Sequence, residues 1–127
     1  MATYSALETL TVEAAADLSG KQYHIIRGAG LNLCNVASDA TNSDMLGVLQ
    51  NKPQSGEFAC VADGGESKVV AGGTVTVYDY VTCNGSGRAA TVASGQMAFG
   101  QALETSGADG EIITARLMKP IRWAGAP

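Results

Sequence analysis

Residues 22–36, QYHIIRGAGLNLCNV, contain two strand-like segments on either side of a glycine-containing turn. Residues 22–27 combine aromatic and β-branched side chains, which are enriched in strands. Residues 31–36 alternate between apolar and polar side chains, the period of a strand with one buried face. Gly28 and Gly30 separate the segments and favour a turn. This stretch predicts two short consecutive strands.

Short strands and turns continue along the rest of the chain. They recur at intervals of about 8–12 residues, the spacing typical of β-sandwiches and barrels. The further strand-like segments are residues 45–50, 57–62, 67–70, 74–81, 88–92, 97–103 and 111–117. Residues 74–81, TVTVYDYV, have the strongest strand composition, and glycine-rich turns are predicted at 63–65 and 84–87. We therefore expect an all-β fold, a small barrel or sandwich with little helix.

The two halves of the chain resemble each other. At an offset of 53 residues, Gly47 and its flanking apolar residues align with Gly100 and its own. With a slip of one residue, the Gly56–Glu57 turn aligns with Gly110–Glu111. This pattern predicts two similar β-units packed with pseudo-two-fold symmetry.

The expected organisation has three parts. Residues 1–16 are expected to form an extended N-terminal arm or a first strand, because they alternate only loosely. Residues 17–119 are expected to form the β domain, with pseudo-repeats at about 18–65 and 71–119. Residues 120–127 are expected to form a C-terminal tail.

The composition argues against several classes of protein. Only 16% of the 127 residues are charged, against about 25% in an average soluble domain. The eight Lys and Arg residues are spread singly, without the basic stripe of a nucleic-acid binder. The hydrophobic content of 46% argues against disorder, and no apolar run approaches the roughly 20 residues of a membrane span. The N-terminus lacks the features of a secretory signal.

The cysteines and the single histidine give little sign of catalytic or metal chemistry. Cys34, Cys60 and Cys83 are widely spaced and odd in number, so we expect free, buried thiols in a reducing compartment. His24 lies in a strand-like segment, where a packed histidine is the expected reading. No catalytic, cofactor-binding or metal-ligating residues are assigned, and we expect the protein not to be an enzyme. The alternative is a small ligand-binding β-barrel or a minor hydrolase using His24.

Five segments together resemble the capsid decoration, or cement, proteins of tailed bacteriophages. Their order and spacing carry the resemblance, because each segment alone consists of ordinary turn and core residues. The segments are ADLSGKQY (16–23), GVLQNKP (47–53), SKVVAGG (67–73), FGQALE (99–104) and GEII (110–113).

The resemblance covers roughly residues 14–117 and implies a structural protein of the virion. Such proteins bind the outer surface of an icosahedral capsid after expansion and stabilise the shell, typically as trimers at three-fold or quasi-three-fold positions. The implied partners are the major capsid protein and further copies of the chain, with no nucleic acid, membrane or cofactor. The protein would be made in the host cytoplasm and reside on the outer capsid surface.

Exposed apolar residues would form the contacts with the capsid or within the trimer. An extended arm can pair its backbone with the edge of a partner's sheet. Trp123 is either a plug over the domain's own core or an interface anchor. For Phe58 and Phe99 we expect ordinary core packing. The candidate contact residues are Tyr4, Leu7, Leu10, Val12, Tyr78, Tyr80 and Trp123.

Overall fold

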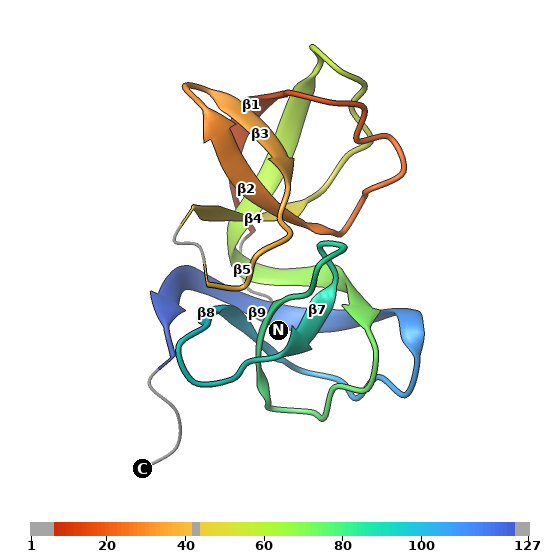
Figure 1. The fold of residues 1–127 in the computed structure, drawn as a ribbon. Coiled ribbons are helices and arrows are strands. Elements are labelled where there is room, and N and C mark those ends of the chain that lie inside the picture. Colours follow the sequence, from red (N-terminus) through yellow and green to blue (C-terminus); the bar gives the residue numbers. More distant parts are fainter. Residues whose placement is uncertain (1–6, 42–43, 124–127) are drawn as a thin grey trace, which may run out of the picture.

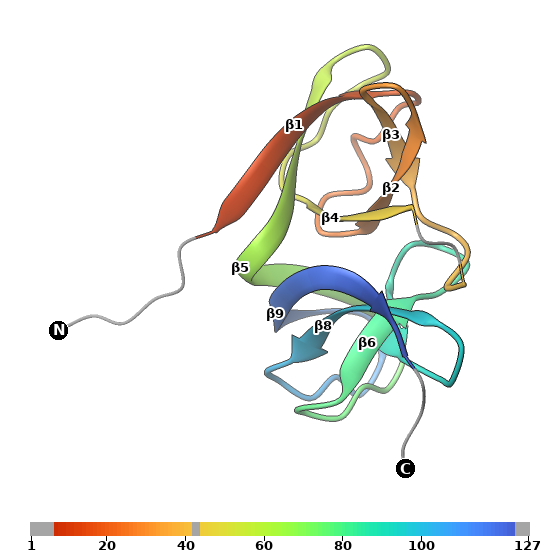
Figure 2. The ribbon, with the colours of Figure 1, turned by 90° about the vertical axis from the view of Figure 1, so that its left-hand side faces the viewer.

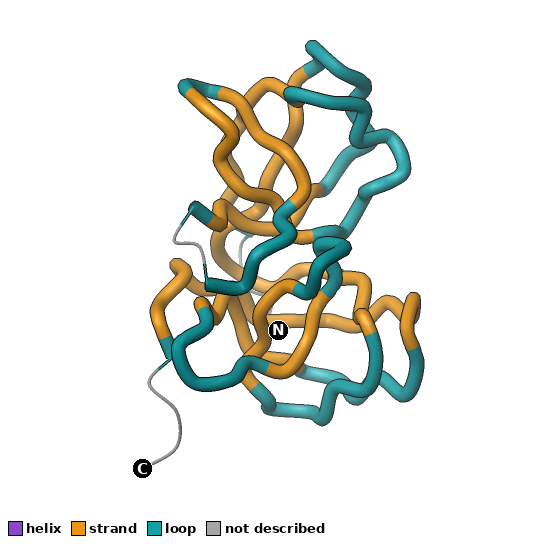
Figure 3. The backbone as a smooth tube through the Cα atoms, in the orientation of Figure 1, coloured by secondary structure: helices purple, strands orange, loops and turns teal. Residues whose placement is uncertain are grey.

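The structure, a computed structural model, describes residues 7–41 and 44–123. This part of the chain is all-β, with nine strands in one sheet and no helix (Figures 1 and 3). Accordingly, no helix in the described residues is long and apolar enough to cross a membrane. The strands are β1 (Glu8–Ala14), β2 (Ile25–Gly30), β3 (Leu33–Val36), β4 (Met45–Leu49), β5 (Phe58–Gly72), β6 (Tyr80–Cys83), β7 (Ala89–Thr91), β8 (Met97–Ala102) and β9 (Asp109–Arg122).

The strands form two units with the same pairing order. Unit 1 has the order β1-β3-β2-β4-β5, and unit 2 has the order β5-β7-β6-β8-β9. In each unit the first strand also pairs with the last, β1 with β5 and β5 with β9, so that the pairing runs in a ring. β5 is shared: residues 58–64 belong to unit 1 and residues 65–72 to unit 2. Figures 1 and 2 show the units stacked, with β5 running from one to the other.

The two strands that contain the aligned glycines Gly47 and Gly100 hold corresponding positions in the two units. Gly47 lies in β4 and Gly100 in β8, each next to the last strand of its unit. A β-carbon at Gly47 would collide with the carbonyl oxygen of Ala62, and one at Gly100 would collide with that of Arg116. Glycine is therefore required at both places because two backbones approach closely. The domain boundaries themselves stay a prediction.

The aligned Gly–Glu turns also correspond in structure. Gly56 and Gly110 have φ values of 86° and 94°, a region that favours glycine. The carboxylate of Glu57 accepts a hydrogen bond from the backbone N–H of Gln54 at 2.7 Å. Glu111 likewise accepts from the N–H of Gly107, at 3.4 Å. A similar turn thus stands at the start of the last strand of each unit, directly before β5 in unit 1 and over the first residues of β9 in unit 2.

The turn predicted at residues 63–65 is wrong, because these residues lie inside the continuous strand β5. Gly64 pairs with Glu8 of β1, whereas Gly65 pairs with Leu117 of β9. A β-carbon at Gly64 would collide with the Glu8 side chain. The Gly–Gly pair thus permits close packing at the point where β5 changes partners, rather than a reversal of the chain.

The strand predicted over residues 74–81 is also wrong for most of its length. Only Tyr80 and Val81 belong to β6, while Val75 forms an isolated bridge with Ser106. Tyr78 has φ 72°, which interrupts an extended strand. The N–H of Asp79 donates to the carbonyl of Thr76 at 3.0 Å and closes a turn there.

The larger of two buried clusters spans both units. It joins Ile25 and Val48 of unit 1 to Val81 and Phe99 of unit 2. The second cluster lies within unit 1, where Leu10 and Val12 pack against it from β1. The predicted core position of Phe99 is confirmed. The same prediction for Phe58 is wrong, because Phe58 is 70% exposed.

Candidate interaction surfaces

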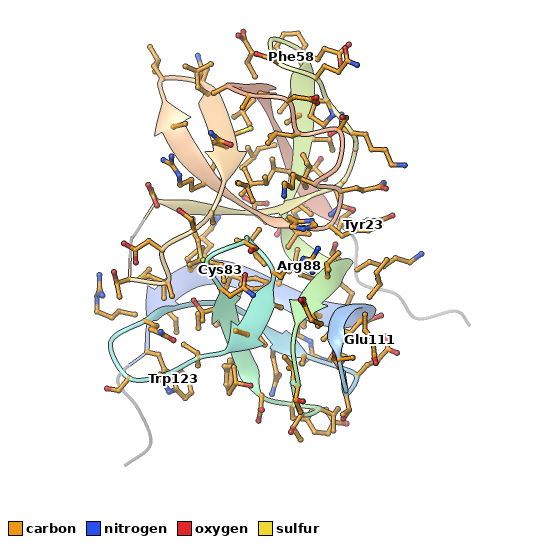
Figure 4. All side chains as sticks on the ribbon, turned by 45° about the vertical axis from the view of Figure 1, so that its right-hand side comes forward. Tyr23, Phe58, Cys83, Arg88, Glu111 and Trp123 are labelled. Carbon is orange, nitrogen blue, oxygen red and sulfur yellow. The ribbon has the colours of Figure 1, made fainter. Side chains whose placement is uncertain are left out.

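The described residues contain surfaces for contact rather than a built chemical centre. No pocket is found, and no group of three or more His, Cys, Asp or Glu side chains among residues 7–41 and 44–123 is arranged to hold a metal ion. The features of interest are a polar cluster at the junction of the units and several exposed apolar side chains. Figure 4 shows the side chains on the ribbon, with Phe58 at one end of the molecule and Trp123 toward the other.

His24 is buried at the junction between the units. Its Nδ1 lies 3.2 Å from the carbonyl oxygen of Gln22, and the Nε–H of Arg88 points to its Nε2 at 3.4 Å. These partners assign the proton to Nδ1, which donates to Gln22, and leave Nε2 as an acceptor. Arg88 in turn pairs with Asp109 at 2.8 Å. Both ring nitrogens contact structural groups, neither of which is a nucleophile that a histidine base would activate.

The burial of His24 predicts a pH dependence of stability. Burial lowers the pKa of His24, and the nearby charges of Lys21 and Arg88 lower it further, against the opposing hydrogen bond to Gln22. The unfolded chain takes up this proton near the ordinary pKa of about 6.5. The free energy of unfolding should therefore fall as the pH drops below about 6.5, and level off once the folded protein is protonated as well. Urea unfolding between about pH 7.5 and 5 measures this change.

The variant His24→Gln serves as the control for this pH dependence. Its difference from the native chain isolates His24, because Asp17, Asp39 and Glu104 have lowered pKa values and titrate at more acidic pH. The variant should lose less stability between these pH values than the native chain does. Parallel losses in the two proteins would contradict the prediction.

The three cysteines are free thiols, as expected, although their burial differs. Cys34 and Cys83 are buried, whereas Cys60 is half-buried. Burial raises the pKa of Cys34, and it raises the pKa of Cys83 to about 11. These two thiols stay protonated at neutral pH and are poor nucleophiles.

The N-terminal candidates divide into packed and accessible side chains. Tyr4 lies outside the described residues. Leu7 is 42% exposed just before β1. Leu10 and Val12 lie in β1, which pairs with β3 and β5, and both pack against the core of unit 1. Of the described candidates in this segment, Leu7 is therefore the side chain most open to a partner.

The other candidate contact residues, Tyr78, Tyr80 and Trp123, lie at the end of unit 2 away from unit 1. Tyr78 is 67% exposed in the β5–β6 connection. Tyr80 and Trp123 are both half-buried, with ring centroids 4.9 Å apart and a tilt of 33°. The backbone N–H of Trp123 donates to the carbonyl of Gln96 at 2.7 Å, which fixes the ring beside β6 and β8. Trp123 thus covers part of its own domain and keeps one part of the ring accessible.

Four exposed apolar side chains are not among the contact residues predicted from the sequence, and one of them is Ile121 in β9, which is 50% exposed. Leu31 is 92% exposed in the β2–β3 turn, and Phe58 begins β5 at the same end of unit 1. Ile112 is 54% exposed and occupies the position in unit 2 that Phe58 occupies in unit 1. Each of the other three follows a glycine within two residues, which is the one signal in the sequence for an exposed position, whereas apolar character alone predicts a core residue.

A buried hydroxyl gives a test of the packing of unit 2. Thr82 is buried in β6, and no described group accepts or donates a hydrogen bond at its Oγ1. Replacing Thr82 by Val removes the unpaired hydroxyl with little change of shape, so the free energy of unfolding should rise by about 1 kcal/mol. Chemical denaturation at neutral pH measures the change.

Ser106→Ala is the matched control for that substitution. The buried Ser106 Oγ lies 3.0 Å from the carbonyl oxygens of Gly73 and Ala108 and donates to one of them. Removing this hydroxyl should lower the free energy of unfolding by about 1 kcal/mol. A loss of stability in both variants would show that the Thr82 hydroxyl does have a partner in solution.

Comparison with known proteins gives one informative result. No family model matches the chain, and no curated protein matches it in sequence. Among solved structures, the head fiber gp8.5 N base of bacteriophage phi29 matches with a TM-score of 0.67 and 20% sequence identity. The match covers 90% of this chain and 96% of that chain. The shared fold is therefore that of a phage head protein, in agreement with the resemblance noted in the sequence.

Proposed function

We propose that this chain is a structural protein of a bacteriophage virion that binds the outside of the capsid and stabilises the expanded shell as a trimer. The observation that carries the proposal is the fold shared with a phage head fiber base over 90% of the chain. The sequence resemblance to decoration proteins supports it independently, because it rests on the order of five segments rather than on the three-dimensional match.

The exposed apolar side chains suit contacts with the capsid or between copies of the chain. Leu31, Phe58 and Tyr78 lie on a domain with a net charge of −4, so close copies repel one another only weakly. A trimer that contacts the shell through three equal patches multiplies a weak contact by avidity. The major capsid protein is the expected partner. Leu7 and the residues before it are proposed to contact the shell.

The proposal is tested with phage heads that lack this chain. Purified protein is mixed with expanded heads and with unexpanded proheads, and the bound fraction is measured after sedimentation. Binding to expanded heads, together with slower loss of DNA on heating, is the expected result. Absence of binding to expanded heads would overturn the proposal.

A truncated protein separates the N-terminal contact from the folded domain. Deleting residues 2–7 leaves all of β1 in place, whereas a deletion through residue 13 would remove most of a strand that pairs with both β3 and β5. The shorter deletion should keep the native melting temperature and lose binding to heads. Undiminished binding would contradict the role of this segment while leaving the rest of the proposal intact.

A further inference from the structure

We propose that the chain associates head to tail with a second copy of itself. In this arrangement the β2–β3 turn of one copy packs on the end of unit 2 in the next, on a surface formed by Tyr78, Tyr80 and Trp123. We call this surface the open face. The proposal goes beyond the proposed function because it names the two contacting surfaces, and it requires no capsid.

The template for this contact lies inside the chain, where unit 2 covers residues 23–25 of unit 1. The carbonyl of Tyr23 accepts a hydrogen bond from the N–H of Val70 at 2.9 Å. The N–H of Ile25 donates to the carbonyl of Gly87 at 2.7 Å. Gly87 lies in the β6–β7 turn, which reaches toward unit 1 in Figure 1. Ile25 is fully buried as a result.

Residues 78–80 repeat the covered segment in unit 2. Tyr78 has φ 72° and Tyr23 has φ 66°, a rare conformation for a bulky residue in both cases. The N–H of Tyr78 donates to the carbonyl of Ala102 and that of Tyr23 to the carbonyl of Leu49, both at 2.7 Å. The two segments are therefore structural equivalents.

No third unit covers residues 78–80 within the described chain. Tyr78 is 67% exposed, whereas its equivalent Tyr23 is half-buried. Tyr80, the equivalent of the fully buried Ile25, is covered in part by Trp123. The β5–β6 connection that carries Tyr78 lies at the end of unit 2 away from unit 1 (Figures 1 and 2). Residues 78–80 of unit 2 thus repeat residues 23–25 of unit 1. Unit 2 covers residues 23–25, whereas the aromatic side chains at 78 and 80 stay accessible.

The other half of the contact is present at the opposite end of the molecule. The turn that covers unit 1 joins β6 to β7, and its equivalent in unit 1 is the β2–β3 turn. This turn projects Leu31, which is 92% exposed. The carbonyl of Asn32 accepts from the N–H of Glu13 at 2.9 Å and holds the turn against β1. Each copy therefore carries both a projecting apolar turn and an aromatic surface of the kind that such a turn covers.

Burial of Leu31 against the aromatic rings supplies the attraction. An apolar side chain with this exposure gains most of its transfer free energy on contact, and Tyr and Trp add area at low entropic cost. The interface is heterologous, because different surfaces of the two copies meet. Such contacts close into a ring when the rotation between copies allows, and otherwise extend into a chain.

The test uses the full-length protein alone, in sedimentation equilibrium over a range from micromolar to millimolar concentration. The native chain should give a mass that rises with concentration to at least twice that of the monomer. Leu31→Asp and Tyr78→Asp should each remain monomeric at all concentrations. An equimolar mixture of the two variants should give dimers and nothing larger, because each variant keeps the one surface that the other lacks.

Two further measurements keep the test decisive. Ile112→Asp, at an exposed apolar position of β9 that belongs to neither surface, should associate as the native chain does. Melting temperatures of all variants should match the native value, because the substituted side chains are exposed. Three results would overturn the proposal. The native chain could stay monomeric, either single variant could still associate, or the mixture of the two variants could stay monomeric. Binding of heads by a native chain that stays monomeric would overturn the proposal as well, and would remove the trimer from the proposed function while leaving the binding to the capsid intact.

Discussion

Replacing Gly47 by Ala should lower the free energy of unfolding by about 3 kcal/mol, the upper part of the range for overpacked sites. The added methyl group would collide with the carbonyl oxygen of Ala62, which belongs to the neighbouring strand β5 and cannot move without breaking its pairing. Gly100→Ala should behave alike, because its β-carbon would lie 2.5 Å from the carbonyl oxygen of Arg116 in β9. Urea unfolding of both variants measures the losses.

Gly20→Ala is the matched control for these two substitutions. No atom lies within 4 Å of a β-carbon at Gly20, and its backbone conformation is ordinary. This variant should be as stable as the native chain or slightly more so, because Ala restricts the unfolded chain. Native stability in Gly47→Ala would show that β4 and β5 do not approach as closely in solution as they do in the structure.

Replacing Phe99 by Ala should cost about 3–5 kcal/mol of stability, the usual loss for a large aromatic core residue. Phe99 is fully buried in the cluster that joins the two units, so the cavity would open where they meet. A loss of this size is a large fraction of the stability of an ordinary domain. The melting temperature and the denaturation midpoint should both fall strongly.

Phe58→Ala provides the same chemical change at an exposed site. Phe58 is 70% exposed at the start of β5, so its removal should change the free energy of unfolding by less than about 0.5 kcal/mol. Comparable losses in the two variants would mean that Phe58 is covered in solution. In that event the assignment of Phe58 to an accessible surface would be wrong.

The all-β class and the doubling of the fold could be predicted because both depend on local features. Alternation of side chains along the chain predicts strands, and the glycines at 47 and 100 mark the same close approach in each unit. Glycine spacing therefore indicates the doubling of the fold, even though the surrounding residues differ between the two units.

The errors arose where distant residues decide the local conformation. The Gly64–Gly65 pair has the composition of a turn, and no local feature of the sequence shows that Glu8 packs against it. Residues 74–81 have the composition of a strand, yet Tyr78 takes a positive φ that its hydrogen bond to Ala102 helps to hold. Strand propensity is easily overridden by such contacts.

The exposure of the candidate contact residues cannot be predicted from the sequence for a related reason. Exposure depends on which side chains a neighbouring strand or unit covers, and a single sequence does not contain this information. The aromatic character of Tyr78 marks it as a candidate in the sequence, whereas the exposure of Leu31 depends on the position of its turn at the end of unit 1.

The shared strand β5 joins the two units into one rigid body rather than two flexibly linked domains. A tether between separate domains would let each take up its own orientation, whereas here one extended backbone is hydrogen-bonded to β1 and β4 on one side of residue 64 and to β9 beyond it. Any rotation of one unit against the other must break the hydrogen bonds that cross the junction, from Val70 N–H to Tyr23 and from Ile25 N–H to Gly87, and must open the buried cluster that the units share. A force applied at the Leu31 end would therefore be carried to the Tyr78 end through these contacts, as the proposed role on a capsid would require.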